Sequence, residues 1–132
     1  MLQATFCLQP AGDTLTRKGL YESVFTGCIP VVFREDKAFL QQLAFSRYIP
    51  YKKMWVYIPA RLVEAGEAHV TSLLRRVPES RIRSIRRHLR RWARCLSFSA
   101  RRDGVAGYNN LDAPDAFTST LREVWHLWQS EE

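Results

Sequence analysis

Blocks of apolar and polar positions along the first quarter of the chain predict a strand, a helix and a second strand. Residues 5–8 (TFCL) form an apolar run followed by Gln-Pro and Gly-Asp, which predicts a buried strand ending in a turn. Residues 14–26 predict a helix whose apolar face consists of Leu20, Tyr21, Val24 and Phe25. Gly27 follows where a C-terminal cap is expected, and residues 28–33 (CIPVVF) predict a second buried strand. This order predicts parallel strands joined by a right-handed crossover.

The rest of the chain predicts mainly helices. Residues 54–60 (MWVYIPA) predict a further strand, and residues 70–77 predict a short helix that stops before Pro78. Residues 79–98 predict a long helix, because apolar side chains recur at alternating spacings of 3 and 4, at Ile82, Ile85, Leu89, Trp92 and Leu96.

The C-terminal stretch predicts a loop followed by one more helix. Asp112 is the predicted N-cap, and Pro114 fits the first turn. The apolar stripe of this helix is formed by Phe117, Leu121, Val124, Trp125 and Trp128.

The fold class predicted from this pattern is α/β and helical towards the C-terminus. We expect one domain over residues 1–132, with a βαβ-type segment over 1–60 and a helical segment over 70–132. The composition is globular, at 46% apolar and 25% charged residues. The first residues lack the pattern of a signal peptide, and no apolar run of about 18 residues predicts a membrane span. A buried strand so close to Met1 predicts the carboxyl-terminal part of a larger protein.

The net charge of +7 belongs to one segment of the chain. The other 13 of the 20 Lys and Arg residues balance the 13 Asp and Glu residues, so the excess comes from Arg81, Arg83, Arg86, Arg87, Arg90, Arg91 and Arg94. The favoured interpretation is the solvated side of a packed helix. Binding of a nucleic-acid backbone or of an anionic membrane is the alternative, and a weak electrostatic attraction to acidic polysaccharide or to the Golgi membrane is a milder form of it. We expect no nucleic-acid partner.

Cysteines, histidines and acidic loop residues give weaker indications. The three cysteines have no C-x-x-C spacing, so buried free thiols are favoured for Cys7 and Cys28, with a disulfide as the alternative. The three histidines have no metal-ligand spacing, so we expect neither a metal nor a cofactor. Glu35 and Asp36 follow the second strand, where α/β proteins bind ligands, but a solvated loop is favoured over contact with a sugar.

Arg17 and Lys18 are the most informative residues, because they stand at a predicted helix start where cations cost up to about 1 kcal/mol. Gly19 adds about 1 kcal/mol in a helix. A bound phosphate would offset both terms. Glu22 lies roughly 7–8 Å further along the axis, a distance suited to a ribose. The alternative is a solvated helix with a surface pair between Lys18 and Glu22. For Thr14, capping the helix is favoured over touching a phosphate.

The stretch FCLQPAGDTLTRKGLYESVFTGCIPVVF closely resembles the donor-binding segment of the exostosin-like glycosyltransferases (glycosyltransferase family 47), especially the plant xyloglucan galactosyltransferase branch. The shared pattern runs Phe-Cys-Leu-x-Pro, Gly-Asp, Thr-Arg-Arg/Lys, an acidic residue and Gly-Cys-Ile-Pro-Val. The likeness continues more weakly through WVYIPARLV, LLRRVPESRIRSIRRHL and DAFTSTLREVW. Ala11 is a minor departure from the pattern. The larger departure is the lack of the family's amino-terminal half, with its membrane anchor and acceptor-binding domain.

The resemblance implies the Rossmann-like carboxyl-terminal lobe of a GT-B enzyme, which transfers a sugar with inversion from a UDP-type nucleotide-sugar donor to a glycan or polysaccharide acceptor. It implies that Thr16, Arg17 and Lys18 hold the leaving diphosphate, that Glu22 holds the ribose and that Thr14 lies nearby. The general base is expected in the missing half, so no catalytic residue is assigned. The full enzyme would lie on the luminal side of the Golgi membrane, and the isolated chain would be inactive. A non-catalytic nucleotide-binding remnant is the alternative.

Overall fold

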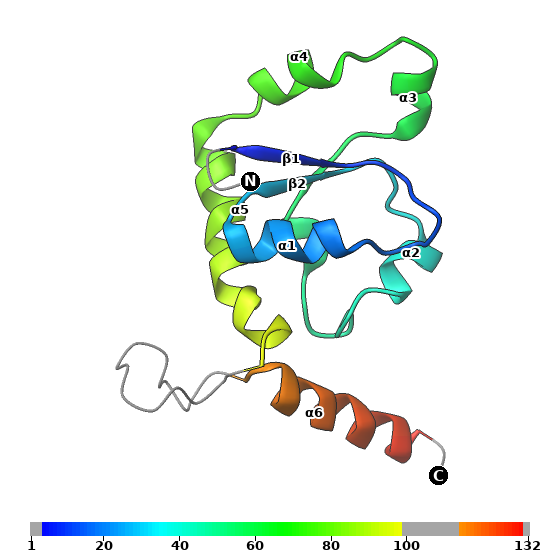
Figure 1. The fold of residues 1–132 in the computed structure, drawn as a ribbon, viewed down its shortest axis with the longest axis vertical. Helices are drawn as coiled ribbons and strands as arrows, with labels where there is room; N and C mark the ends of the chain where they lie inside the picture. Colours follow the sequence, from blue (N-terminus) through cyan, green and yellow to red (C-terminus); the bar gives the residue numbers. More distant parts are fainter. Residues whose placement is uncertain (1–3, 99–113, 131–132) are drawn as a thin grey trace. The chain divides into compact units, whose positions relative to one another are not determined.

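The computed structural model describes residues 4–98 and 114–130. The chain divides into two compact units between Arg91 and Trp92. The first unit contains a parallel sheet surrounded by helices, and the second contains a short 3₁₀ helix and the C-terminal helix (Figure 1). The fold is thus mixed α/β, as predicted. A single donor-binding domain over residues 1–132, with segments 1–60 and 70–132, stays a prediction.

The sheet has three parallel strands in the order β1-β2-β3, namely β1 (Phe6–Gln9), β2 (Ile29–Val32) and β3 (Val56–Tyr57). In the register, Val31 lies opposite Leu8 on one side and Val56 on the other. Every residue of β2 is buried, which explains why its sequence is continuously apolar rather than alternating. The three predicted strands are confirmed: the first is shifted by one residue, and the other two are shorter than predicted. The predicted parallel pairing of the first two strands is also confirmed.

Helix α1 (Lys18–Thr26) packs against β1 and β2. It starts four residues later than predicted, with Arg17 at the N-cap position, and Gly27 ends it in the left-handed conformation at φ 70°, as expected. The buried residues are Leu20, Ser23 and Val24, so the helix has a polar residue in its packed face, whereas Phe25 of the predicted apolar face is half exposed. The apolar spacing predicted the helix but not its full contact surface.

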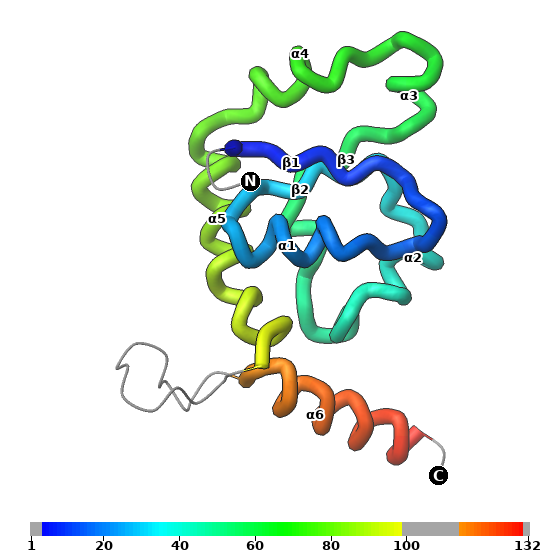
Figure 2. The backbone as a smooth tube through the Cα atoms, in the orientation of Figure 1, coloured from blue at the N-terminus to red at the C-terminus, as the bar shows by residue number. Residues whose placement is uncertain are grey.

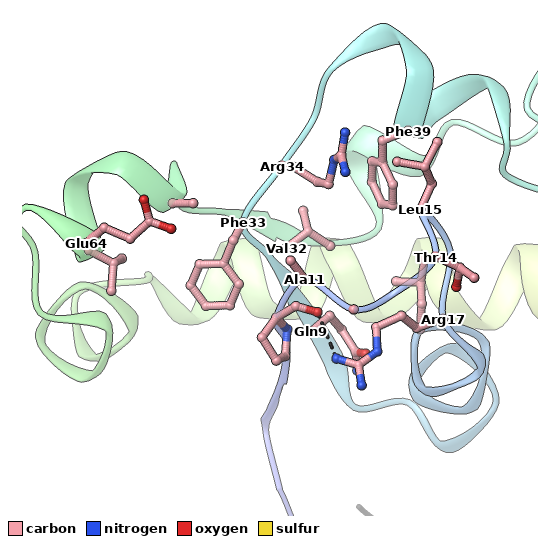
Figure 3. Close-up of a pocket in the computed structure, with 15 residues that line it drawn as sticks. Gln9, Ala11, Thr14, Leu15, Arg17, Val32, Phe33, Arg34, Phe39 and Glu64 are labelled. Carbon is pink, nitrogen blue, oxygen red and sulfur yellow. Dashed lines mark hydrogen bonds between the residues drawn. The ribbon is translucent and has the colours of Figure 1, made fainter.

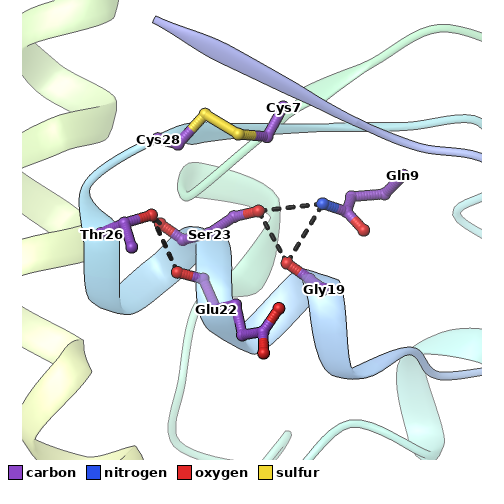
Figure 4. Close-up of a disulfide and its surroundings, with 7 residues drawn as sticks. All are labelled: Cys7, Gln9, Gly19, Glu22, Ser23, Thr26 and Cys28. Carbon is purple, nitrogen blue, oxygen red and sulfur yellow. Dashed lines mark hydrogen bonds between the residues drawn. A yellow bond between two sulfur atoms is a disulfide. The ribbon is translucent and has the colours of Figure 1, made fainter. Parts of the chain in front are cut away.

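Cys7 and Cys28 form a disulfide, so the favoured prediction of free thiols was wrong (Figure 4). The parallel register places Phe6 opposite Ile29, and this brings the two cysteines to a Cα–Cα distance of 5.8 Å, within the range for a disulfide. The bond spans 21 residues of sequence that include the loop after β1 and all of α1. Cys95 is the free cysteine, and it is buried.

Three short helices between β2 and the later helices were not predicted: α2 (Lys37–Gln41), the 3₁₀ helix η1 (Tyr51–Lys53) and α3 (Ala60–Glu64). Trp55 anchors this region, because its ring lies 5.8 Å from the ring of Phe39 and 5.7 Å from that of Tyr51. All three aromatic residues are buried. The core therefore extends from the sheet into the segment between β2 and β3.

Helices α4 (Val70–Arg75) and α5 (Glu79–Trp92) follow, and Figure 2 shows α5 running crosswise to β1 and β2. The prediction of one helix over residues 79–98 was wrong at its C-terminal end, because the 3₁₀ helix η2 (Ala93–Leu96) succeeds α5. Residues three apart align in a 3₁₀ turn, so Cys95 rather than Leu96 becomes the buried residue there. Ile82, Ile85 and Leu89 are buried as predicted.

The second unit is built from η2 and α6 (Ala116–Gln129). Asp115 is the N-cap and accepts from the Thr118 N–H at 2.9 Å. The predicted N-cap Asp112 lies outside the described residues, and Pro114 precedes the helix instead of entering its first turn. Ala116 and Ser119 are buried, whereas the predicted apolar stripe is more than half exposed. Among the residues that the structure describes, no helix is long and apolar enough to cross a membrane.

Candidate functional site

A pocket of about 290 Å³ opens at the carboxyl ends of β1 and β2, beside the start of α1 (Figure 3). The loop after β1, the loop after β2 and helix α3 form its walls. Most lining side chains are apolar, and the polar ones are Gln9, Thr14, Arg17, Arg34 and Glu64. Ligands of open α/β sheets bind at this edge, because the helix starts and loops that carry polar groups converge there.

Arg17 belongs to the lining of this pocket. Its Nη1 donates to the Pro10 carbonyl at 2.9 Å, which ties the helix start to the preceding loop. A Cβ added to Gly12 would lie 3.0 Å from the Arg17 Nε, so the glycine makes room for the guanidinium. The guanidinium has five N–H donors, and one contact to a carbonyl leaves others for an anion.

Gln9 fixes α1 against the end of β1 (Figure 4). Its Nε2 donates to the Gly19 carbonyl at 3.1 Å and to the Ser23 Oγ at 2.9 Å, and the Ser23 hydroxyl donates to the Gly19 carbonyl at 2.7 Å. A Cβ on Gly19 would lie 3.0 Å from the Gln9 Oε1. Packing therefore explains the glycine at position 19, because its lack of a side chain lets Gln9 approach the first turn of α1. Sequence reasoning missed this role.

The structure separates the predicted site residues into two groups. Thr14 and Arg17 line the pocket, whereas Thr16, Lys18 and Glu22 lie outside its lining. Lys18 is 89% exposed, and its Nζ lies 3.1 Å from the Glu22 Oε1, so the predicted surface pair is present. An exposed pair of this kind contributes about 0.3–0.5 kcal/mol.

Thr14 does not cap α1, so that prediction was wrong. Its hydroxyl donates to the Thr16 carbonyl at 2.6 Å, and Thr14 itself lies four residues before the helix begins at Lys18. Arg17 occupies the N-cap position instead, and no side chain in the described residues caps the helix. The first N–H groups of α1 therefore lack the acceptor that a capping residue supplies.

Arg34 is a pocket residue that sequence reasoning missed, although it directly follows the second strand, at the edge where ligands bind. Its Nε and Nη2 lie 2.8 and 2.7 Å from the Asp36 Oδ2. Asp36 is also the N-cap of α2 and accepts from the Phe39 N–H at 3.0 Å. The Phe39 N–H and the Arg34 guanidinium hold the pKa of Asp36 below its ordinary value.

Glu35 is not the solvated loop residue that was predicted. The Trp55 Nε1 donates to its Oε1 at 2.8 Å, and the Lys52 Nζ lies 3.6 Å from its Oε2. The Glu35 side chain is only 18% exposed, so this carboxylate anchors the loop to the core. Neither Glu35 nor Asp36 belongs to the lining of the pocket, whose acidic member is Glu64 of α3.

The chemistry of these groups suits an anion attached to a flat or apolar group. Arg17 and Arg34 supply positive charge, and Phe33, Leu15 and Val63 supply apolar walls. The start of α1 adds partial positive charge of its own. Within residues 4–98 and 114–130, no three His, Cys, Asp or Glu side chains lie close enough together to hold a metal ion.

Comparison with known proteins identifies the family. The exostosin GT47 domain matches residues 1–77. Probable xyloglucan galactosyltransferase GT13 of Arabidopsis thaliana is 37% identical over 123 residues, which cover 92% of this chain and 25% of the relative. Probable xyloglucan galactosyltransferase GT15 of the same plant is 40% identical over 89 residues, covering 65% of this chain and 18% of the relative. Xyloglucan galactosyltransferase MUR3, also of Arabidopsis thaliana, is 31% identical over 86 residues, covering 64% and 13%.

The chain thus spans a quarter or less of the length of these relatives. The matched region contains the whole pocket, because all its lining residues lie between Gln9 and Glu64. The match covers more than half of this chain, so the chain belongs to the exostosin GT47 family.

Proposed function

We propose that this chain is the donor-binding part of a glycosyltransferase that moves a sugar, with inversion, from a UDP-type nucleotide-sugar donor to a glycan or polysaccharide acceptor. The observation that carries the proposal is the pocket at the carboxyl ends of β1 and β2, with Arg17 and Arg34 in its lining. The relatives named as xyloglucan galactosyltransferases support the class of reaction. The parallel sheet and its crossover through α1 fit the Rossmann-like lobe of a GT-B enzyme.

In this proposal, the diphosphate of the donor lies at Arg17 and the start of α1. Transfer with inversion releases a nucleoside diphosphate, whose developing charge needs fixed donors and cations. The Arg17 fork, the uncapped N–H groups and the helix dipole together supply them. Thr14 and Thr16 add hydroxyls to the same loop.

The remaining predicted residues lie along the exposed side of α1. Ligand pockets typically measure about 300–1,000 Å³. The cavity of about 290 Å³ lies at the small end of this range. We place the ribose outside the cavity, at Glu22, and Lys18 beside the diphosphate. Binding would then exchange the Lys18–Glu22 pair, at 3.1 Å, for contacts with the donor.

The acceptor site and the general base belong, in this proposal, to other parts of a longer enzyme, so the isolated chain does not transfer sugar. The Cys7–Cys28 disulfide supports assignment of that enzyme to the lumen of the secretory pathway, at the Golgi membrane, because disulfides persist in oxidising compartments.

Titration calorimetry of the 132-residue chain with UDP tests this proposal. Arg17→Ala removes a charge-assisted contact worth about 1.5–3 kcal/mol, so we expect affinity for UDP to fall about ten- to a hundredfold. Arg17→Lys keeps the charge without the fork and is expected to recover part of the loss. Glu22→Ala is expected to weaken binding less, since a ribose contact is uncharged on one side.

Arg75→Ala on α4 is the matched control, because it removes an exposed arginine outside the pocket. The Arg75→Ala variant should bind UDP with the affinity of the unchanged chain. The melting temperatures of all variants should agree closely. An unchanged chain that does not bind UDP, or an Arg17→Ala variant that binds it equally well, contradicts the proposal.

A further inference from the structure

The outer side of α5 carries a surface that the pocket does not use. Ile82, Ile85 and Leu89 are buried, so this side of the helix packs within the first unit. On the opposite side, five arginines lie within about 140° of the helix circumference. We call this set the arginine face, and its members are Arg83, Arg86, Arg87, Arg90 and Arg91. Arg86 is partly exposed and the other four are exposed.

The arginine face concentrates like charge to a degree that helix stability does not favour. The members repeat at i, i+3 and i, i+4 spacings, at which like charges destabilise a helix. Five charges lie along about 12 Å of helix axis. Glu79 is the single acidic residue of α5, and its carboxylate is 3.9 Å from Arg83. The partial negative charge at the helix C-terminus stabilises Arg90 and Arg91, but it does not reach the other three arginines of the face. A polyanion bound along the arginine face would offset the repulsion between these positive charges.

The chemistry of the arginine face distinguishes among polyanions. A helix that binds a membrane surface inserts its apolar side, whereas the apolar side of α5 is already buried. Proteins that bind single-stranded nucleic acid interleave aromatic side chains with the charges, and this face contains none. Guanidinium groups pair with carboxylates in a bidentate manner. The arginines recur every three or four residues, about 4.5–6 Å along the helix axis, a spacing that suits regularly spaced carboxylates.

We propose that the arginine face binds a linear polysaccharide with repeated carboxylate groups, a polyuronate, and so tethers an acidic glycan to the enzyme. This inference rests on the proposed function for its glycan acceptor. No member of the arginine face is among the residues that line the pocket. The face would therefore hold a stretch of a long chain away from the reacting hydroxyl.

Binding of polygalacturonate to the full chain tests the inference. The test variant is the triple change Arg83→Ser, Arg87→Ser and Arg90→Ser, and the matched control is Arg61→Ser, Arg75→Ser and Arg76→Ser, which alters net charge equally at exposed positions on and beside α3 and α4. We expect the test variant to bind at least tenfold more weakly and the control to bind like the unchanged chain. Raising salt from about 50 to about 200 mM should weaken binding of the unchanged chain far more than of the test variant.

Neutral xyloglucan, duplex DNA, RNA and anionic lipid vesicles serve as competing partners. Equal binding by the test and unchanged chains overturns the inference, as does equal loss in the control. Tighter binding of nucleic acid or vesicles than of polygalacturonate, through the same three arginines, also overturns it. The UDP affinity of the test variant should match the unchanged chain, so failure here is distinguishable from failure of the donor-site proposal.

Discussion

Two glycines leave room for polar side chains at the proposed donor site. Gly12 leaves space for the Arg17 guanidinium, and Gly19 leaves space for the Gln9 amide, each with a hypothetical Cβ only 3.0 Å from the neighbouring atom. Neither has a positive φ, so these glycines serve close approach rather than a special backbone conformation. Gly27 is the contrasting case, because its φ of 70° ends α1 and nothing lies near its missing side chain.

Gly12→Ala tests whether the position of Arg17 matters for the donor. The new methyl group must displace the guanidinium by a few tenths of an ångström, and we expect UDP affinity to fall about threefold to tenfold. The melting temperature should stay equal or rise slightly, because alanine restricts the unfolded chain.

Gly27→Ala is the control for this change. It forces alanine into a left-handed conformation and should lower the melting temperature while leaving UDP affinity unchanged. If Gly12→Ala instead destabilised the chain and bound UDP normally, the loop would be structural only.

Sequence reasoning placed Arg17 near the start of α1 and Gly27 at its end, but it wrongly assigned the cap to Thr14 and missed contacts between residues distant in the sequence. Arg17 at a helix start and Gly27 at a helix end follow from rules that act over one turn. The Gln9–Gly19 contact and the Cys7–Cys28 bond join residues 10 and 21 positions apart. Such contacts depend on the sheet register, which the sequence pattern does not specify. The position of Arg34 directly after the second strand pointed to the ligand-binding edge of the sheet, but Arg34 belongs to no sequence motif that would have singled it out.

At the scale of elements, apolar runs identified the strands and apolar periodicity identified the longer helices. Helices α1, α5 and α6 were predicted because each shows apolar residues at helical spacing. The five-residue helices α2 and α3 were missed, since an amphipathic pattern needs more than one turn to become visible. The pocket is lined by residues of predicted elements and of the unpredicted helices α2 and α3. Only the side formed by β1, β2 and α1 could therefore be predicted from the sequence.

The cap of α2 should give the protein a pH-dependent element near the pocket. The pKa of Asp36 is lowered by the Phe39 N–H and by Arg34, so the carboxylate stabilises the fold above its unfolded pKa, and this contribution is lost as pH falls below about 3.8. Asp36→Asn keeps a capping oxygen but not the charge.

Thermal unfolding at several pH values measures this effect. The unchanged chain should melt above Asp36→Asn at pH values above 3.8, and the gap should narrow as the pH drops further below this value. A gap that stays constant over this range would show that the Asp36 charge contributes nothing.

At the scale of the whole molecule, the disulfide closes a loop that supplies one wall of the pocket. It joins β1 to the start of β2 across the 21 positions that contain the pocket loop and α1. Closure of a loop of this size stabilises a fold by about 2–4 kcal/mol. The protein thus fixes the site by one covalent bond, one glutamine and the register of two strands.

Thiol counting tests this covalent arrangement, because all three cysteines are described. In a thiol assay, the denatured, unreduced chain should contain one reactive thiol per chain, that of Cys95. After reduction it should contain three. In the folded chain, Cys95 should react slowly, because burial raises its pKa. Three equivalents without reduction would rule out the disulfide in the prepared protein.

Amide NMR spectra of the isotope-labelled chain during titration with UDP test the donor-site claim most directly. We expect the shifts to concentrate in residues 11–22 and at Phe33 and Arg34, around the pocket and the first half of α1, and we expect the amide signals of α5 to stay unchanged. Shifts confined to α5 would mean that UDP merely finds the arginine face. That result, or a spectrum that UDP leaves unchanged, would contradict the assignment of this pocket as the donor site.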